Sequence, residues 1–527
     1  MFGGLRDTSS RIAIAAALGM TLGGFAMSST PVKAADLGGD CCADLEERVA
    51  ELEATTVRKG NKKVSVTLSG WVVELGTFWN DGKTSGLYWG GKDTTLSSHL
   101  NISGQATIAP GWTGGYTLWL ETLGNSASAG FIENQFNDNA QLVGPGGINT
   151  LDSYMWIKSD KYGTVNWGRL TQASNNLALL PDLSGTIIES NAVLFDGAGF
   201  FLRPKGARNS NDMNADFTWL AVNNCLSGGG GVSADCPTGL DGNGVRYDSP
   251  TYAGFSISGG EYENTEWDIA AKYAADWGNF KVSAAYSYTE NTDEGCNSRA
   301  STVPGGNCTF GAENGGGGAP FQGFRKDIRT NQVGASAMHV PSGLFVYGLY
   351  QNEENHGTKF TNENIVLDTP RNSNANETNV WFGKVGIKRT WTPLGATVLW
   401  GEGGESRNEF GGLCGLPIAG DDDSCEAQIP TSINLNGTAN TSNVQVKSSD
   451  VTRYGAGVVQ EIDSAAMHVF FRWQHLNLDM STICDGPTPG DGVGNCTVGN
   501  HTVALGSHFS PSFSGLDLFQ VGGVIFF

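Results

Sequence analysis

The feature that most limits the fold of this chain is a period of two in its apolar residues after Lys63. Between Trp267 and Tyr288, apolar and aromatic side chains occupy every second position, while small or polar side chains occupy the others. A turn at positions 276–279 separates the two halves, so the segment predicts a β-hairpin. Strands of soluble β-sandwiches also alternate, but a small polar face and aromatic residues at the strand ends favour a barrel wall between lipid and water.

The same alternation recurs along the chain. It is clear at 100–108, at 381–400 and at 451–476, and in the last two segments a short turn joins two runs. The hairpins are separated by long connections, which we expect at 125–147, 291–326, 354–376, 407–449 and 479–500. Short turns at one end and long loops at the other are typical of transmembrane barrels. The sequence therefore predicts an all-β, antiparallel transmembrane barrel over residues 62–527.

The composition argues against several other classes of protein. Glycine accounts for 75 of the 527 residues and only 16% are charged, which fits neither a coiled coil nor an ordinary charged cytosolic enzyme. The 14 Trp, 13 Tyr and 25 Phe argue against disorder, and the net charge of −21 argues against nucleic-acid binding. The histidines are scattered and the sequence has no metal, phosphate-loop or nucleophile-elbow motif, so we expect neither an enzyme nor a cofactor.

The first 34 residues have the order of a secretory signal peptide. Arg6 and Arg11 precede the apolar stretch 12–27, and a small-residue cleavage pattern follows at 32–34. We predict cleavage after Ala34 or one residue later. A transmembrane anchor is the alternative, although the apolar stretch is short compared with the ~20 residues that span a bilayer.

Residues 35–61 are predicted to form a short helical or coiled-coil segment in the periplasm. Within this segment, 44–57 reads DLEERVAELEATTV, and Leu45, Val49 and Leu52 follow a 4–3 spacing. Two heptads are too short to be stable alone, so the helix either forms a seam between subunits or packs on its own domain. A disordered or plug-like segment is the remaining alternative.

The spacing of the ten cysteines predicts braced loops. Eight of them form four close pairs in stretches rich in Gly, Asn, Asp or Pro: Cys225 and Cys236, Cys296 and Cys308, Cys414 and Cys425, Cys484 and Cys496. In a secreted protein this spacing favours local disulfides. The neighbours Cys41 and Cys42 rarely bond to each other without strain, so they either cross-link subunits or remain thiols.

The chain ends on an alternating strand. Phe519, Val521, Ile525 and Phe527 fall on one face of the last residues. This pattern resembles the terminal aromatic strand of outer-membrane barrel proteins, which the barrel assembly machinery reads as an assembly signal. The last strand of a soluble sheet is the alternative.

Three segments resemble general bacterial porins, and those of alphaproteobacteria in particular. The run 154–170, which passes through Gly163-Thr164-Val165 to Gly168-Arg169-Leu170, resembles their fourth and fifth strands. The run 245–255 resembles the hairpin of the sixth and seventh strands. The opening from Cys41 to the strand 64–71 is similar to alphaproteobacterial porins, so the resemblance touches both ends and the middle of the mature chain.

The resemblance implies a 16-stranded barrel, a homotrimer in outer-membrane lipid and lipopolysaccharide, and passive diffusion of small hydrophilic solutes and ions. Eighteen strands would result if 200–207 and 216–222 formed a wall hairpin. With 16 strands, residues 171–241 form a long third loop that folds inward and narrows the pore. Its acidic residues Asp182, Glu189 and Asp196 would then face a basic wall, for which alternation selects Arg169, Arg246, Lys272, Lys384, Arg453 and Arg472.

Two other functions are compatible with such a barrel. An envelope adhesin or structural barrel would bind partners through its loops, and a selective channel would bind a sugar or an anion in its lumen. We expect a diffusion porin with a preference for cations, because the net charge of −21 concentrates cations near the pore mouth.

The cysteine spacing makes the first prediction. Reduction of the folded protein should increase protease cleavage within 225–236, 296–308, 414–425 and 484–496, because each disulfide closes a short loop. Heat resistance in detergent should change little, and limited proteolysis followed by a heated gel measures both. Loss of the barrel on reduction would show that the cysteines pair elsewhere.

Overall fold

The computed structural model describes most of the chain after Lys63. The described residues are 64–92, 96–122, 135, 148–192, 197, 199–205, 219, 222, 241–263, 266–292, 294–296, 322–325, 328–355, 358–361, 366–367, 377–407, 426–433, 439–484, 495–498, 501–504 and 507–527. The predicted signal peptide and the predicted helix at 44–57 lie outside them and stay predictions. Within the described residues, no helix is long and apolar enough to cross a membrane.

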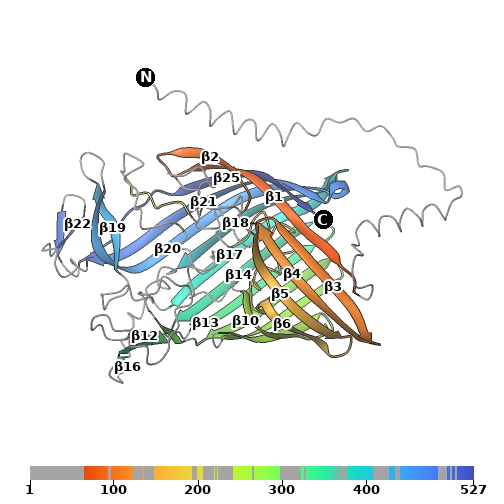
Figure 1. The fold of residues 1–527 in the computed structure, drawn as a ribbon. Helices are drawn as coiled ribbons and strands as arrows, with labels where there is room; N and C mark the ends of the chain where they lie inside the picture. The colour runs from red at the N-terminus through yellow and green to blue at the C-terminus, as the bar shows by residue number, and fades with distance from the viewer. Residues whose placement is uncertain are drawn as a thin grey trace. The chain divides into compact units, whose positions relative to one another are not determined.

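Sixteen antiparallel strands form a closed ring (Figure 1). In order around the ring they are β1 (Thr67–Asn80), β3 (His99–Ala109), β4 (Trp112–Thr122), β5 (Ile148–Ser159), β6 (Gly163–Thr171), β7 (Asp241–Asp248), β8 (Phe255–Tyr262), β9 (Glu266–Trp277), β10 (Phe280–Asn291), β13 (Ile328–His339), β14 (Leu344–Asn355), β17 (Glu377–Thr392), β18 (Gly395–Arg407), β20 (Ala439–Ile462), β21 (Met467–Cys484) and β25 (Leu516–Phe526). Each strand pairs with the next, and β25 pairs with β1, so that Trp71 lies opposite Phe526. The prediction of 16 strands is confirmed.

The alternative of 18 strands is wrong. The wall closes without 200–207 or 216–222, because β6 pairs directly with β7. Phe200 and Trp219 are instead fully buried residues of the loop between these two strands.

Several short strands lie outside the ring. β2 (Ser85–Gly90) extends the edge of β1, β19 (Glu426–Ile433) pairs with β20, and β24 (His508–Phe509) pairs with β21. β11 (Glu294–Cys296), β12 (Gln322–Arg325), β15 (Thr358–Thr361) and β16 (Val366–Leu367) form a small separate sheet, and β22 (Asn495–Val498) pairs with β23 (His501–Ala504). The expected loops at 407–449 and 479–500 therefore contain strand, since β20 begins at Ala439 and β21 continues to Cys484.

The connections differ at the two ends of the barrel. One end has only short turns, at 110–111, 160–162, 249–254, 278–279, 340–343, 393–394 and 463–466, the last of which contains the 3-10 turn η5 (Asp463–Ala465). The other end has the long connections, except for a turn of three residues at 263–265. This asymmetry is the one that the sequence predicted.

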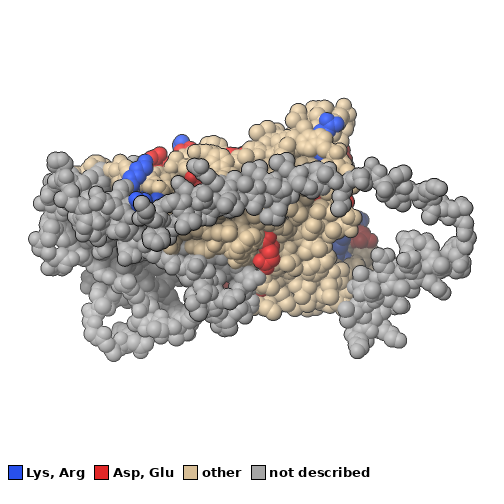
Figure 2. Space-filling model, turned by 90° about the horizontal axis from the view of Figure 1, so that it is seen from above, with Lys and Arg blue, Asp and Glu red and all other residues tan. Residues whose placement is uncertain are grey.

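The strand register separates an outward from an inward face. In the hairpin of β9 and β10, Trp267, Ile269 and Phe280 are exposed on the outside, whereas Ala270 and Ser287 are buried on the inside. Where Figure 2 shows the described surface, charged side chains are few. An uncharged outer wall with aromatic residues near its ends suits a lipid environment.

The last strand closes this outer wall. Phe519, Val521 and Ile525 alternate with buried inward residues of β25, and Phe527 is 58% exposed. The backbone N–H and carbonyl of Phe527 both bond to Gly70 of β1. The terminal residues therefore complete the hydrogen bonding of the seam, and their reading by the assembly machinery stays a prediction.

Two glycines in the short turns allow a matched test of turn geometry. Gly278 and Gly343 both have a positive φ, of 62° and 74°. A Cβ at Gly278 would meet nothing within 4 Å, whereas a Cβ at Gly343 would overlap the carbonyl oxygen of Lys388. Gly278→Ala should therefore cost about 1–2 kcal/mol from backbone strain alone, and Gly343→Ala should cost more. Urea unfolding in detergent would measure the difference, and equal midpoints would contradict it.

Candidate functional site

Part of the barrel interior is filled by a segment of the chain that packs against inward residues of the wall. The filling segment is the loop between β6 and β7, residues 172–240, which we call L3. Its described residues run along the inner faces of successive strands from β9 to β21. The third loop is therefore folded inward, as the resemblance implied.

L3 is held by hydrogen bonds from one wall strand after another. The backbone N–H of Ser174 donates to Asp268 of β9 at 2.6 Å. The hydroxyl of Tyr347 on β14 donates to the carbonyl of Ala178 at 2.8 Å. The guanidinium of Arg453 on β20 donates to the carbonyls of Asn191 and Ala192. Because buried backbone groups need partners, these side chains fix the path of the loop.

Lys384 of β17 is the most enclosed of these anchors. Its Nζ lies 2.8 Å from Asp182 Oδ2, and the two side chains are 0% and 2% exposed. The same Nζ donates to Thr186 Oγ1 at 3.0 Å and to the carbonyl of Ser190. An ammonium group buried this deeply stays charged only because it is surrounded by acceptors, so this contact ties L3 to the wall.

A second set of charges anchors the next part of L3. Arg472 of β21 lies 2.8 Å from Glu402 of β18, and Glu402 also accepts a hydrogen bond from Ser190. Further along β21, His468 Nδ1 lies 2.6 Å from Glu189, whose side chain is fully buried. Acidic and basic groups are thus paired beneath L3 and do not face each other across open water.

Apolar side chains fill the interior near the short turns. Inward residues of six strands pack into one cluster, consisting of Val73, Leu75, Phe345, Val398, Trp400, Val459, Phe470 and Val524. Ile188 of L3 packs against it. On the side from β14 to β1 the space between L3 and the wall is therefore closed by hydrophobic contact.

The far part of L3 returns to the first strands. Arg203 lies 2.7 Å from Asp81 after β1, and its guanidinium also donates to Thr84 at 2.8 Å. Phe200 packs edge-on against Trp79 of β1 at 5.3 Å between ring centroids. Both ends of the described loop are thus attached to the wall.

On the wall from β3 to β9, inward side chains such as Gln105, Lys158 and Lys272 are exposed. Arg246 of β7 lies 3.2 Å from Asp248, which also accepts a hydrogen bond from Asn166 at 2.7 Å. Lys272 of β9 is exposed and faces inward in register with Ser256. The structure therefore leaves two of the predicted wall residues, Arg246 and Lys272, beside the part of the lumen that the described residues of L3 do not fill.

The other predicted site residues lie elsewhere. Asp182 and Glu189 contact Lys384 and His468 behind L3, and Lys384, Arg453 and Arg472 are covered by the loop. Asp196 lies outside the described residues.

Arg169 is on the outward face of β6. It is in register with Ser153 and Asn243, on the same side as the outward residue Val245. Its Nε donates a hydrogen bond to the carbonyl of Leu151 at 3.1 Å. A role of any of the predicted site residues in the pore stays a prediction.

The sequence analysis did not single out Glu402, His468 or Asp268. Alternation along β18, β21 and β9 places these three side chains on the inward face. A charged residue at an inward position of a strand was the signal by which the sequence could have identified them.

The predicted disulfides stay predictions: five of the eight cysteines lie outside the described residues, and the side chains of Cys296, Cys484 and Cys496 are not described. No cluster of three or more metal-binding side chains occurs among the described residues.

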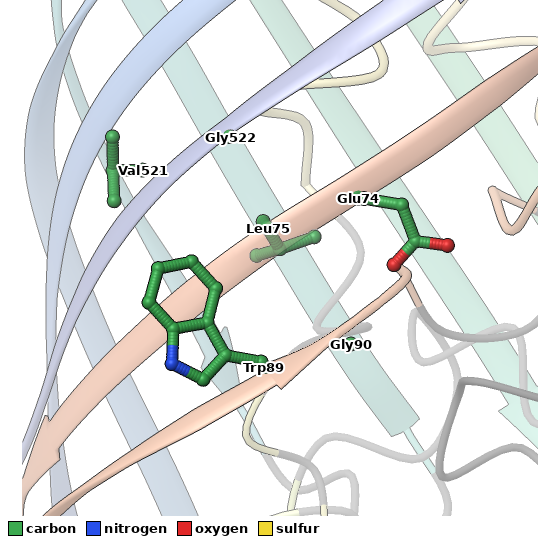
Figure 3. A pocket seen from close by; sticks show the side chains of 6 residues that line it. All are labelled: Glu74, Leu75, Trp89, Gly90, Val521 and Gly522. Atoms are coloured by element: carbon green, nitrogen blue, oxygen red, sulfur yellow. The ribbon is translucent and has the colours of Figure 1, made fainter.

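A separate pocket lies on the outer surface, where β1, β2 and β25 meet (Figure 3). It has a volume of about 280 Å³ and is lined by Glu74, Leu75, Trp89, Gly90, Val521 and Gly522. Trp89 is 73% exposed, and it lies in register with Gly76 and Val521 on the outward face. This pocket is a feature of the outer wall and does not belong to the lumen.

Comparison with known proteins identifies the family of the chain. A family model described as Gram-negative porin matches residues 15–477. No curated protein matches the chain. Similar solved structures include an anion-selective porin from Comamonas acidovorans, with 16% identity over 88% of this chain and 100% of that one and a TM-score of 0.44. Another is OmpF of Salmonella typhi in complex with daunomycin, with 12% identity over 89% and 99% of the two chains and a TM-score of 0.40. The match to the family model covers most of the sequence, and the chain belongs to the Gram-negative porin family.

Proposed function

We propose that this outer-membrane porin conducts small hydrophilic solutes and ions through the side of its lumen bounded by β3 to β9. The observation that carries this proposal is the attachment of L3 to the opposite wall by Lys384, Arg453 and the apolar cluster around Phe470. A loop held against one side narrows the barrel without closing the other side. Family and fold favour a channel over an enzyme, and we propose no catalytic activity.

We further propose a homotrimer, in keeping with the family. The outer pocket beside Trp89 supports an interface along the first and last strands, because an exposed indole and a depression together suit protein packing. Outer-membrane lipid, lipopolysaccharide and the barrel assembly machinery are the other expected partners.

Conductance of the purified protein in a planar bilayer tests the proposal. Single insertions should give ohmic currents that close in three equal steps, one for each barrel of a trimer. A folded protein that inserts and carries no current would contradict the diffusion function and favour the adhesin.

Removing the buried anchor of L3 should change the behaviour of the channel. Lys384→Met would leave the carboxylate of Asp182 buried without its cation, a change that typically costs about 3–5 kcal/mol. We expect L3 to leave the wall and the current to become noisy, with frequent partial closures in single-channel records. Lys281→Met is the control, since this inward lysine of β10 is exposed. Quiet Lys384→Met channels would show that the apolar contacts hold L3 without the ion pair.

The open basic wall should influence ion selectivity. Lys272→Gln removes a positive charge that faces the lumen near Arg246, so the permeability ratio should move toward cations at low salt. The reversal potential in a salt gradient measures this ratio. Lys161→Gln in a short turn is the control, because it changes the net charge equally outside the lumen. Equal shifts in the two variants would assign selectivity to the total charge of the protein.

A further inference from the structure

We propose that the lumen wall formed by β3, β4 and β5 contains a binding subsite for neutral sugars, centred on Trp156. This inference rests on the proposed function, since a sugar reaches the subsite only through an open lumen. This side of the pore would bind one class of solute, neutral sugars, besides letting small solutes pass.

Trp156 forms a flat platform on the wall. It lies opposite Gly115 in the pairing of β4 and β5. A Cβ on Gly115 would overlap the Cζ2 atom of the indole, so the ring rests directly on the glycine backbone. The edge of the indole at Cζ2 and Cε2 therefore lies against the wall, and the inward side chain is partly exposed. Only a residue without a side chain permits this arrangement.

Two further aromatic residues continue the platform along the same inward face. Tyr154 precedes Trp156 by two positions on β5, and Trp119 of β4 lies diagonally from Tyr154. Such neighbours are spaced by about 7 Å along and across a sheet, a distance that one sugar ring can bridge. Trp119 in turn contacts Trp71 of β1, with 6.2 Å between ring centroids.

Most inward residues around this aromatic series are neutral and able to form hydrogen bonds, and the exposed Lys158, which lies opposite Thr113 and two positions after Trp156, stands at one edge of the series. In register with one another they are Asn101, Ser103, Gln105 and Thr107 of β3 and Thr113 and Thr117 of β4. At these positions of β3 and β4 and at 154–156 of β5, no inward residue is charged. Hydroxyl-rich, uncharged solutes match such a wall, because their ring faces stack on aromatics and their hydroxyls need both donors and acceptors.

Some of this hydrogen-bonding capacity is not used by the fold. Asn101 and Trp119 lie opposite each other, and neither Oδ1 of Asn101 nor Nε1 of Trp119 has a hydrogen-bond partner in the described part of the chain. Both atoms are buried, and an unused acceptor beside an unused donor there is costly for a protein and suits a bound water.

A cation is a poorer match for the platform than a sugar. The quadrupole of an aromatic ring attracts a cation to the ring face, and other positive charges nearby oppose that attraction. The inward carboxylate opposite Trp119 is Asp152, which is only 3% exposed and accepts hydrogen bonds from the backbone N–H and hydroxyl of Thr171 at 2.7 and 2.9 Å. The nearest inward basic groups are Lys158 at the end of the platform and Arg246, which lies opposite Asn166, the partner of Trp156. Their positive charges further disfavour a cation at this site.

Current recordings with added maltotriose test the inference on the full-length porin. The open-channel current should fall with sugar concentration and reach a plateau, as expected for a saturable site. Trp156→Ala should weaken the apparent affinity about tenfold, because it removes the stacking face. Trp156→Phe should retain most of the affinity. Trp277→Ala is the control, since this tryptophan is 60% exposed on the lipid side of β9.

The outcomes separate the two proposals. Absence of any current would contradict the proposed diffusion function, whereas normal current without saturable sugar block would overturn only the sugar subsite. Equal block in Trp156→Ala, or block by tetraethylammonium in place of maltotriose, would also overturn it. If Trp156→Ala does not fold, Gln105→Ala, which leaves the platform in place and removes a neighbouring amide, should still weaken the block.

Discussion

The closure of the strand ring at β1 and β25 is the constraint on which the rest of this structure depends. In lipid, an unpaired strand edge would leave backbone N–H and carbonyl groups without partners, at several kcal/mol each. Pairing from Trp71 opposite Phe526 to Asn80 opposite Asp517 removes that edge. Because side chains alternate along every strand, closure also decides which residues face lipid and which face the lumen. A shift of one residue at this seam would place Gln520 in lipid and Phe519 in the interior.

Within the closed ring, L3 decides how much of the lumen stays open. Its position is set by buried charges, of which the pair of Lys384 and Asp182 is the most enclosed. Such pairs contribute little net stability, because desolvation offsets their attraction, but they penalise any other position of the loop. The apolar contact of Ile188 with the cluster around Phe470 adds a hydrophobic contribution that does not depend on charge. Together, the buried ion pairs and the apolar contact hold L3, which contributes no strand to the wall, in one position.

Much of this architecture follows from local sequence pattern, and the rest depends on distant contacts. Alternation placed the hairpins of β9 with β10 and of β17 with β18, and the porin-like run at 154–170 identified the fourth and fifth wall strands. Periodicity also separated inward from outward residues. It contains no information on which inward residues L3 covers, because that depends on contacts such as that between Arg453 and Asn191, which are 262 positions apart. Lys384 and Lys272 therefore looked alike in sequence, although one is buried under the loop and the other faces open lumen.

The position of L3 also separates two chemical surfaces in the open half of the pore. The wall of β7 and β9 presents Arg246, Asp248 and Lys272, while the wall of β3 to β5 presents Trp156 among mostly neutral amides and hydroxyls, with Lys158 at the edge. Charge acts on ions over the ~8 Å Debye length at physiological salt, whereas stacking and hydrogen bonding act only on contact. An ion can thus respond to the charged wall without touching the aromatic one, and a sugar can bind the aromatic wall with little effect from the charges. Because the two surfaces lie on different strands, selectivity for ions and retention of neutral solutes can vary independently within one barrel.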